Sequence, residues 1–385
     1  MNLKVGSMGK RSLLLLACLV TAAVFAAGTV RAADARTFYM GFMTFLHDIG
    51  PRAEAEFRDF VRQNGDIVDI QFEGVPWVEA LADMPFHENL MKEWKQQKAL
   101  VPPGVKLYLG VTPLNGVRAA MADYRGASEH MPLPGKFKGK AFDDPVIMKA
   151  YLNYCKRAAE FFQPDFMAIG IETNELYHNA PADWPGYVKL HKYVYRELKR
   201  LHRNLPIFTT LTLHSMLNPN WKDRQQMFEA FTQLMDCNDL VVISFYPFFG
   251  HLSAEVDEAF AWLTRSFDQF GKPYAVGESG ESAEAMRVPF GEHVVTMDGS
   301  PELQASFYKK LLALAEQRKF TFVIESIPRD YDARWKKNKD EFPPFFIAWK
   351  DCGLIDGEGN KRPAYYTWRE YFDMPLKPLP VGGYK

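Results

Sequence analysis

The sequence predicts an α/β fold, a single-domain (β/α)8 TIM barrel, and three observations lead to this expectation. Eight short β-rich segments alternate strictly with eight helix-like segments, the number of pairs needed to close such a barrel. The segment 33–385 is long enough, because these barrels commonly span about 250 residues or more. Three long connections follow the third, seventh and eighth predicted strands, at the end of a barrel where active sites lie.

The predicted strands are rich in β-branched and aromatic residues and are bounded by turn residues. They are 38–42, 67–72, 106–111, 166–172, 207–213, 240–246, 274–278 and 320–325. The predicted helices repeat apolar residues with a period of 3.6. They are 52–63, 85–98, 143–162, 186–203, 222–236, 254–269, 301–318 and 363–372. The long connections 113–142, 279–299 and 326–345 are expected to build a cleft.

Capping residues support these boundaries. Asp143-Asp144-Pro145 places acidic residues and an early proline at the start of the third long helix, and Gln163-Pro164 ends it. Ser300-Pro301-Glu302 starts the helix at 301–318 in the same way. No repeat, low-complexity tract or interdomain linker interrupts this alternation, so one domain is expected.

The N-terminus predicts export. Lys4, Lys10 and Arg11 precede an apolar segment at 13–27, and Val30-Arg31-Ala32 resembles a signal-peptidase site. The apolar segment is shorter than the roughly 20 residues of a membrane-spanning helix. We therefore predict a signal peptide at 1–32 and a secreted or periplasmic protein. A lipoprotein site at Cys18 is the second interpretation.

Composition limits the possible partners. The net charge of −1 provides no basic surface for nucleic acid, and no second apolar segment is long enough to cross a membrane. The nine histidines show no metal-ligand spacing, and His191 and His202 are expected to face solvent. No metal or cofactor is implied, and the oligomeric state stays open. Cys155, Cys237 and Cys352 allow one disulfide of undetermined pairing, although buried free thiols are commoner.

Two glutamates stand where a catalytic pair would be expected. Glu172 ends the fourth predicted strand and Glu278 ends the seventh. Alternation along a strand places Ala168, Gly170 and Glu172 on one face, which we expect to point into the barrel. The same rule groups Tyr274, Val276 and Glu278. Two carboxyl groups facing each other across a glycosidic bond are the machinery of a glycoside hydrolase.

Other residues are candidates for the acid or for sugar binding. Glu175 is a rival acid, because it lies three residues beyond Glu172 in the loop. Asn174 could bind a sugar hydroxyl. Rigid aromatic rings pack well on the apolar faces of sugars, and Tyr246 and Trp77 are the first candidates. The others are Tyr177, Trp184, Phe248 and Trp335.

Four segments carry a resemblance to a known group. They are DDPVIMKAYLNYCKRAAEFFQPDFMAIGIETN at 143–174, VVISFYPFF at 241–249, KPYAVGESG at 272–280 and DCGLIDGEGNKRPAYYTW at 351–368. The chain resembles the clan A retaining glycoside hydrolases, and most closely the endo-β-1,4-galactanase family. The resemblance implies Glu172 as acid/base and Glu278 as nucleophile. It also implies Tyr246 beside the nucleophile and His214 lining the sugar site.

The chain departs from the clan pattern at two places. The clan usually has Asn directly before the acid/base, and this chain has Ile171, for which Asn174 could substitute. The second strand usually ends near an arginine that holds the nucleophile, and 69–74 contain none. The leading prediction is an exported retaining hydrolase that cleaves a poly- or oligosaccharide, with endo action favoured by the long loops. The alternative is a carbohydrate-binding TIM barrel with impaired catalysis. A barrel hydrolase or lyase of other chemistry has no supporting motif.

Overall fold

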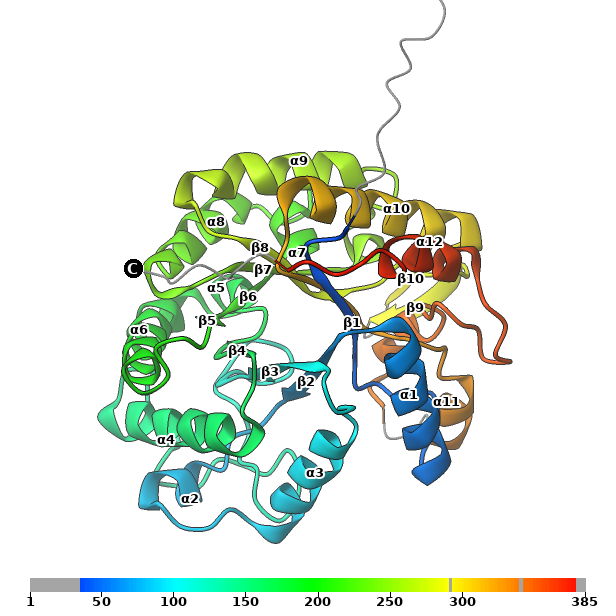
Figure 1. The fold of residues 1–385 in the computed structure, drawn as a ribbon. Coiled ribbons are helices and arrows are strands. Elements are labelled where there is room, and N and C mark those ends of the chain that lie inside the picture. Colours follow the sequence, from blue (N-terminus) through cyan, green and yellow to red (C-terminus); the bar gives the residue numbers. More distant parts are fainter. Residues whose placement is uncertain (1–34, 291–292, 339–341, 379–385) are drawn as a thin grey trace, which may run out of the picture. The chain divides into compact units, whose positions relative to one another are not determined.

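The computed structural model describes residues 35–290, 293–338 and 342–378, and the predicted signal peptide lies outside these ranges. Parallel strands form one sheet with the order β5-β4-β3-β2-β1-β11-β8-β7-β6, and helices surround it (Figure 1). The strands are β1 (Tyr39–Met43), β2 (Ile67–Phe72), β3 (Lys106–Val111), β4 (Phe166–Ala168), β5 (Ile207–Phe208), β6 (Thr210–Thr212), β7 (Val241–Phe245), β8 (Tyr274–Ser279) and β11 (Phe322–Glu325).

The ninth strand of the sheet results from a break in the predicted fifth strand. β5 pairs with β4, whereas β6 pairs with β7, so the two pieces stand at opposite ends of the strand order and together complete the ring. Thr209 lies between β5 and β6, and its backbone N–H donates a hydrogen bond to Asn238 Oδ1 at 2.8 Å. The predicted (β/α)8 TIM barrel is therefore confirmed.

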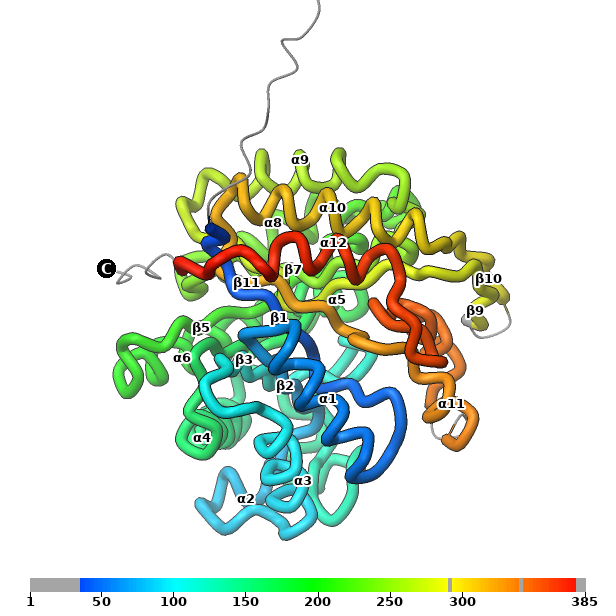
Figure 2. Tube along the Cα trace, turned by 45° about the vertical axis from the view of Figure 1, so that its right-hand side comes forward, coloured from blue at the N-terminus to red at the C-terminus, as the bar shows by residue number. Residues whose placement is uncertain are grey.

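The helices follow the strands as the hydrophobic period predicted. The major ones are α1 (Pro51–Asn64), α3 (Glu88–Ala99), α4 (Pro145–Phe162), α6 (Trp184–Leu201), α8 (Arg224–Thr232), α9 (Val256–Phe267), α10 (Pro301–Arg318) and α12 (Pro363–Phe372). Asp144 and Ser300 cap α4 and α10 with their side chains, as their positions in the sequence suggested. In Figure 2, α12 lies along α10, and Trp368 on α12 donates its indole N–H to Asn64 O at the end of α1.

Several elements were not predicted. The short helices are α2 (Trp77–Ala82), α5 (Asn174–Asn179), α7 (Leu213–Leu217) and α11 (Asp332–Asn338). The connection after β8 contains an antiparallel hairpin of β9 (Met286–Phe290) and β10 (His293–Met297). These elements lie in the connections that follow strand C-termini, where long loops were expected to form a cleft.

The core has two layers separated by the sheet. Inside the barrel, Ile67, Tyr108, Ala168 and Phe322 pack together, whereas residues of opposite parity such as Met167 pack under the helices. Cys155, Cys237 and Cys352 are buried free thiols, so no disulfide forms among the described residues. His191 is also buried, and its Nε2 lies 2.9 Å from Cys237 O, so its predicted exposure is wrong. No described helix is both long and apolar enough to cross a membrane.

Candidate active site

Glu172 lies just beyond β4, at the C-terminal end of the barrel. Its backbone has φ 52°, a left-handed conformation that non-glycine residues rarely adopt. Its backbone N–H donates to Thr210 Oγ1 at 2.8 Å, which holds this conformation. The side chain is 18% exposed, so the carboxyl group remains accessible at the barrel mouth. Strained backbone of this kind is typical of functional sites.

The predicted alternation of β4 holds only as far as Ile169. A Cβ on Gly170 would lie 2.3 Å from the hydroxyl of Tyr187 on α6, so Gly170 faces the outer helices and not the barrel interior. Ile171 Cδ1 lies 3.3 Å from where a Cβ on Gly110 would stand, on the inner side of β3. The predicted inward row of Ala168, Gly170 and Glu172 is therefore wrong at Gly170. The turn at Glu172, and not strand geometry, aims its carboxyl group.

Glu278 reaches the barrel mouth through a β-bulge. Ile243 pairs with Val276, but the next residue, Ser244, pairs with Glu278, so Gly277 is the extra residue. Tyr274 and Val276 pack outward under the helices, while Ala275 faces the barrel interior. The predicted grouping of Tyr274, Val276 and Glu278 on the inner face is wrong. The bulge reverses the parity and turns Glu278, which is 9% exposed, towards the site.

Glu278 is held by two neutral donors. Gln71 Nε2 on β2 donates to Glu278 Oε1 at 3.0 Å, and the Tyr246 hydroxyl donates to Oε2 at 2.9 Å. The second N–H of Gln71 goes to Asp69 Oδ2 at 2.9 Å, which orients the amide towards the glutamate. Ser326 Oγ lies 2.6 Å from the Tyr246 hydroxyl at the end of β11.

The only cation in direct contact with either glutamate, among the described residues, is Arg118. It lies in the connection after β3, and its Nη2 stands 3.4 Å from Glu172 Oε2. Its Nη1 binds Glu73 Oε1 at 2.6 Å, just beyond β2. The guanidinium is 8% exposed and is also braced by the carbonyls of Asn115 and Gly116. A loop residue thus provides the positive charge that the second strand lacks.

These surroundings divide the roles of the two carboxyl groups. Burial and the nearby charge of Glu278 raise the pKa of Glu172 to about 8, while Arg118 opposes the increase. Burial also raises the pKa of Glu278, but the hydrogen bonds from Gln71 and Tyr246 favour its ionised form and limit the increase. Of the two carboxyl groups, Glu172 is therefore the one that its surroundings favour as the proton holder, and Glu278 is the one whose hydrogen bonds favour the carboxylate.

His214, predicted to line the sugar site, lies on α7 beside Tyr246. Its Nδ1 accepts the backbone N–H of Tyr246 at 3.3 Å, and the two rings are 6.0 Å apart. Burial lowers the pKa of His214 to about 3, so the ring is neutral at physiological pH. The structure thus brings His214 and Tyr246 together with Glu278.

Three other predicted site residues have local structural partners. Asn174 is fully buried, and its amide accepts the Thr212 N–H at 2.7 Å, so it does not replace the missing clan asparagine. Glu175 accepts a hydrogen bond from Ser215 Oγ at 2.7 Å, which joins α5 to α7. Trp77 is 0% exposed and donates to Ala122 O, so it has no face available for a sugar. Of the remaining aromatic candidates, Trp335 is half-buried and Trp184 and Phe248 are buried.

Sequence reasoning missed Gln71, Asp69, Arg118 and Ser326. The inward parity of β2 could have identified Gln71, because Ile67, Asp69 and Gln71 share one face. Ser326 directly follows the predicted eighth strand. Nothing in the sequence singles out Arg118 from other cations, because it lies inside the long connection 113–142.

Comparison with solved structures agrees with this architecture. A family 5 subfamily 18 glycoside hydrolase from Bifidobacterium longum subsp. longum matches with a TM-score of 0.62 at 14% identity, over 89% of this chain and 81% of that one. Fungal β-1,4-galactanases match with a TM-score of 0.54 at 15% identity, over 81% and 90% of the two chains. An exo-β-1,4-mannosidase from Opitutaceae bacterium strain TAV5 matches at 0.59 and 12% identity, over 89% and 60%.

At these identities the likeness establishes the fold. The barrel of this chain is similar to the barrels of these glycoside hydrolases, the fungal β-1,4-galactanases among them. No protein-family model matches the chain, and no curated protein matches it.

Proposed function

We propose that the protein is an exported retaining glycoside hydrolase that cleaves a poly- or oligosaccharide by double displacement. The observation that carries this proposal is that two glutamates at the barrel mouth have surroundings that favour different protonation states. The pKa of Glu172 is raised to about 8, whereas Glu278 accepts two hydrogen bonds that favour its carboxylate form. One group can then donate a proton while the other attacks.

In the first step, Glu278 attacks the anomeric carbon and Glu172 gives its proton to the departing oxygen. In the second, Glu172 removes a proton from water, which displaces Glu278 from the sugar with a second inversion. The mechanism predicts a carboxyl separation of about 5–5.5 Å. Gln71 and Tyr246 position the nucleophile, and Arg118 stabilises the deprotonated state of Glu172 between the steps.

The names of similar structures and the surrounding loops support a proposal for the substrate class. One similar structure holds Manb1-4GlcNAc, and others are named as β-1,4-galactanases and an exo-β-1,4-mannosidase. We propose a β-linked glycan, cleaved within the chain because long connections surround the site. The sequence at 1–32 supports export to the periplasm or the medium.

The decisive experiment measures reducing sugar released from a panel of β-1,4-mannans, β-1,4-galactans and their oligosaccharides, with the product anomer followed by NMR. Retention of configuration supports the proposal, and inversion overturns double displacement. Glu278→Ala should abolish turnover while sugar binding persists. Oligosaccharide binding without turnover in the wild type would instead establish the alternative, a sugar-binding barrel, which Ile171 before the acid and the absence of arginine at 69–74 favour.

A further inference from the structure

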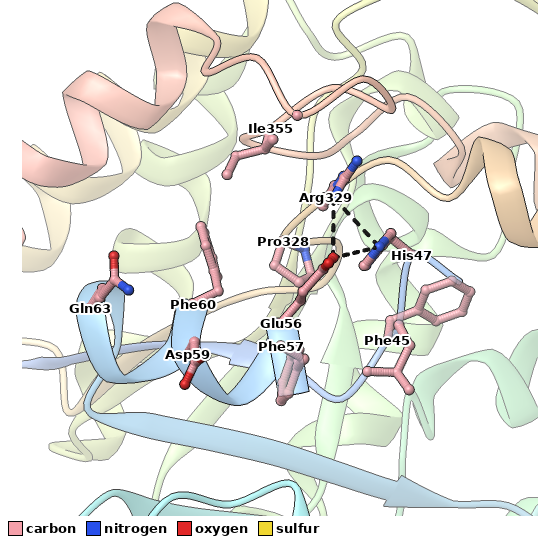
Figure 3. A pocket seen from close by; sticks show the side chains of 12 residues that line it. Phe45, His47, Glu56, Phe57, Asp59, Phe60, Gln63, Pro328, Arg329 and Ile355 are labelled. Carbon is pink, nitrogen blue, oxygen red and sulfur yellow. Dashed lines mark hydrogen bonds and ion pairs between the residues drawn. The ribbon is translucent and has the colours of Figure 1, made fainter. Parts of the chain in front are cut away.

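A second hollow lies beside the barrel mouth, between α1 and the connections that follow β1 and β11 (Figure 3). Its volume is about 320 Å³, within the range of small-ligand pockets. We call it the outer pocket and define it by Phe45, His47, Glu56, Phe60, Arg329 and Ile355. None of these residues belongs to the catalytic machinery described above.

One wall of the outer pocket is polar and nearly balanced in charge. His47 Nε2 lies 3.2 Å from Glu56 Oε2, and Arg329 Nη1 lies 3.5 Å from each of these two atoms. Burial and the neighbouring Arg329 lower the pKa of His47, so this ring is neutral near pH 7. Arg329 also has a buried Nε that finds no hydrogen-bond partner among the residues that the structure describes. The wall therefore offers donors and acceptors but little net charge.

Apolar side chains flank this polar wall on both sides. Phe45 lies beside His47, whereas Phe60 and Ile355 lie on the other side of Glu56 and Arg329 (Figure 3). All three are partly buried members of hydrophobic clusters. A pyranose ring has the same mixed character, with apolar C–H faces and hydroxyl groups around its edge. A lipid would leave the polar wall unsatisfied, and an anionic ligand would meet Glu56.

Another hollow lies beside both the outer pocket and Gln71 of the candidate active site. This hollow of about 330 Å³ shares Phe45 and Leu46 with the outer pocket and is also lined by Gln71, which donates to Glu278. Arg329 follows Ser326 by three residues, so at most about 10 Å of chain separates them. Ser326 in turn contacts Tyr246 at the nucleophile.

The walls of the outer pocket are already braced. Arg329 Nη2 donates to Gly357 O at 2.8 Å, and the Asp330 N–H donates to Ile355 O at 2.9 Å. The backbone N–H of Arg334 on α11 donates to His47 O at 3.2 Å. The pocket is therefore preformed, and binding of a ligand would not carry the entropic cost of ordering a loop.

We infer that the outer pocket is a distal subsite, which binds a neutral sugar residue of the substrate chain away from the bond that is cleaved. This inference rests on the proposed function, because the occupant is part of the same glycan. His47, Glu56 and Arg329 bind its hydroxyl groups, and Phe60 and Ile355 pack against its ring. The subsite makes the protein select for chain length.

The test compares kcat/KM over a β-1,4-linked manno- or galacto-oligosaccharide series, from disaccharide to hexasaccharide, whichever the wild type cleaves. Glu56→Gln and Arg329→Met should lower kcat/KM for the longest substrates about tenfold or more, because each loses a charge-assisted hydrogen bond. The shortest cleaved substrate should change less than about twofold. Glu54→Gln, on α1 but outside the pocket, is the matched control.

If the variants lose kcat/KM equally at every chain length, or lose none at any length, the subsite is overturned. Turnover by the wild type would still support the proposed function in that case. Calorimetric titration with the hexasaccharides separates the remaining cases. Binding without turnover, weakened by Glu56→Gln and not by Glu54→Gln, keeps the subsite and overturns the enzymatic proposal. Binding unaffected by Glu56→Gln overturns the subsite, and no binding of any probe overturns both.

Discussion

Arg118 pairs with Glu172, the proposed acid, and not with Glu278, the proposed nucleophile. Its Nη2 lies 3.4 Å from Glu172 Oε2, while Glu278 is held by the neutral donors of Gln71 and Tyr246. In the clan that the sequence resembles, an arginine near the end of the second strand usually holds the nucleophile, and this chain has none at 69–74. Here the positive charge comes from the connection after β3 and lowers the pKa of the group that must hold a proton. Burial and the charge of Glu278 outweigh it.

The first prediction concerns the alkaline limb of the pH profile. Glu172 must be protonated to donate, and its pKa is about 8, so kcat/KM should fall as pH rises through that value. Initial rates between pH 4 and pH 10 measure this limb. In Glu172→Gln, with a substrate whose leaving group needs no protonation, the limb should disappear. If the alkaline limb persists in this variant, it reports the titration of a group other than Glu172.

Arg118→Met should shift the same limb upward. Removing the cation takes away the interaction that favours ionised Glu172, so its pKa rises. Arg118→Lys keeps the charge and is the control. Glu73→Gln should have the opposite effect, because the negative charge of Glu73 raises the pKa of Glu172. Shifts of the same sign in Arg118→Met and Glu73→Gln would contradict this electrostatic account.

Gln71→Leu should affect the acidic limb. The Gln71 hydrogen bond favours ionised Glu278, so its loss raises the pKa of Glu278 and moves the acidic limb to higher pH. We expect kcat/KM to fall about 10- to 100-fold, the usual effect of losing a hydrogen bond to a charged group. Tyr246→Phe should move the limb in the same direction. An unchanged limb in both variants would mean that Glu278 does not control it.

Gly170→Ala should destabilise the barrel. The added Cβ would lie 2.3 Å from the Tyr187 hydroxyl and 2.7 Å from Thr209 Oγ1, both in the packed layer under α6. We expect a loss of about 1–3 kcal/mol in the free energy of unfolding, as for other overpacked positions. Urea denaturation measures it. Tyr187→Phe in the same chain should restore part of the loss, and full additivity of the two changes would argue against this contact.

The sequence alone determined the barrel and the approximate place of the catalytic pair. Hydrophobic period and strand count depend on local residues, so α12 and the strands at 67–72 and 106–111 agree with their predicted limits. Glu172 and Glu278 end strands, and parallel strands all end on one face of a barrel, so the sequence could place both at its mouth. The sugar-binding role predicted for Trp77 could not be judged in this way, because burial depends on what packs above the ring.

Only the tertiary structure decided how the two carboxyl groups are aimed and held. The bulge at Gly277 turns Glu278 to the face opposite Tyr274 and Val276, and the left-handed turn at Glu172 aims its carboxyl group where the alternation of β4 no longer holds. Arg118 and Gln71 contact the pair from two separate segments of the chain, and Ser326 contacts Tyr246 from a third. Such contacts between distant segments leave no periodic signal, because each depends on where the packed barrel brings its loops.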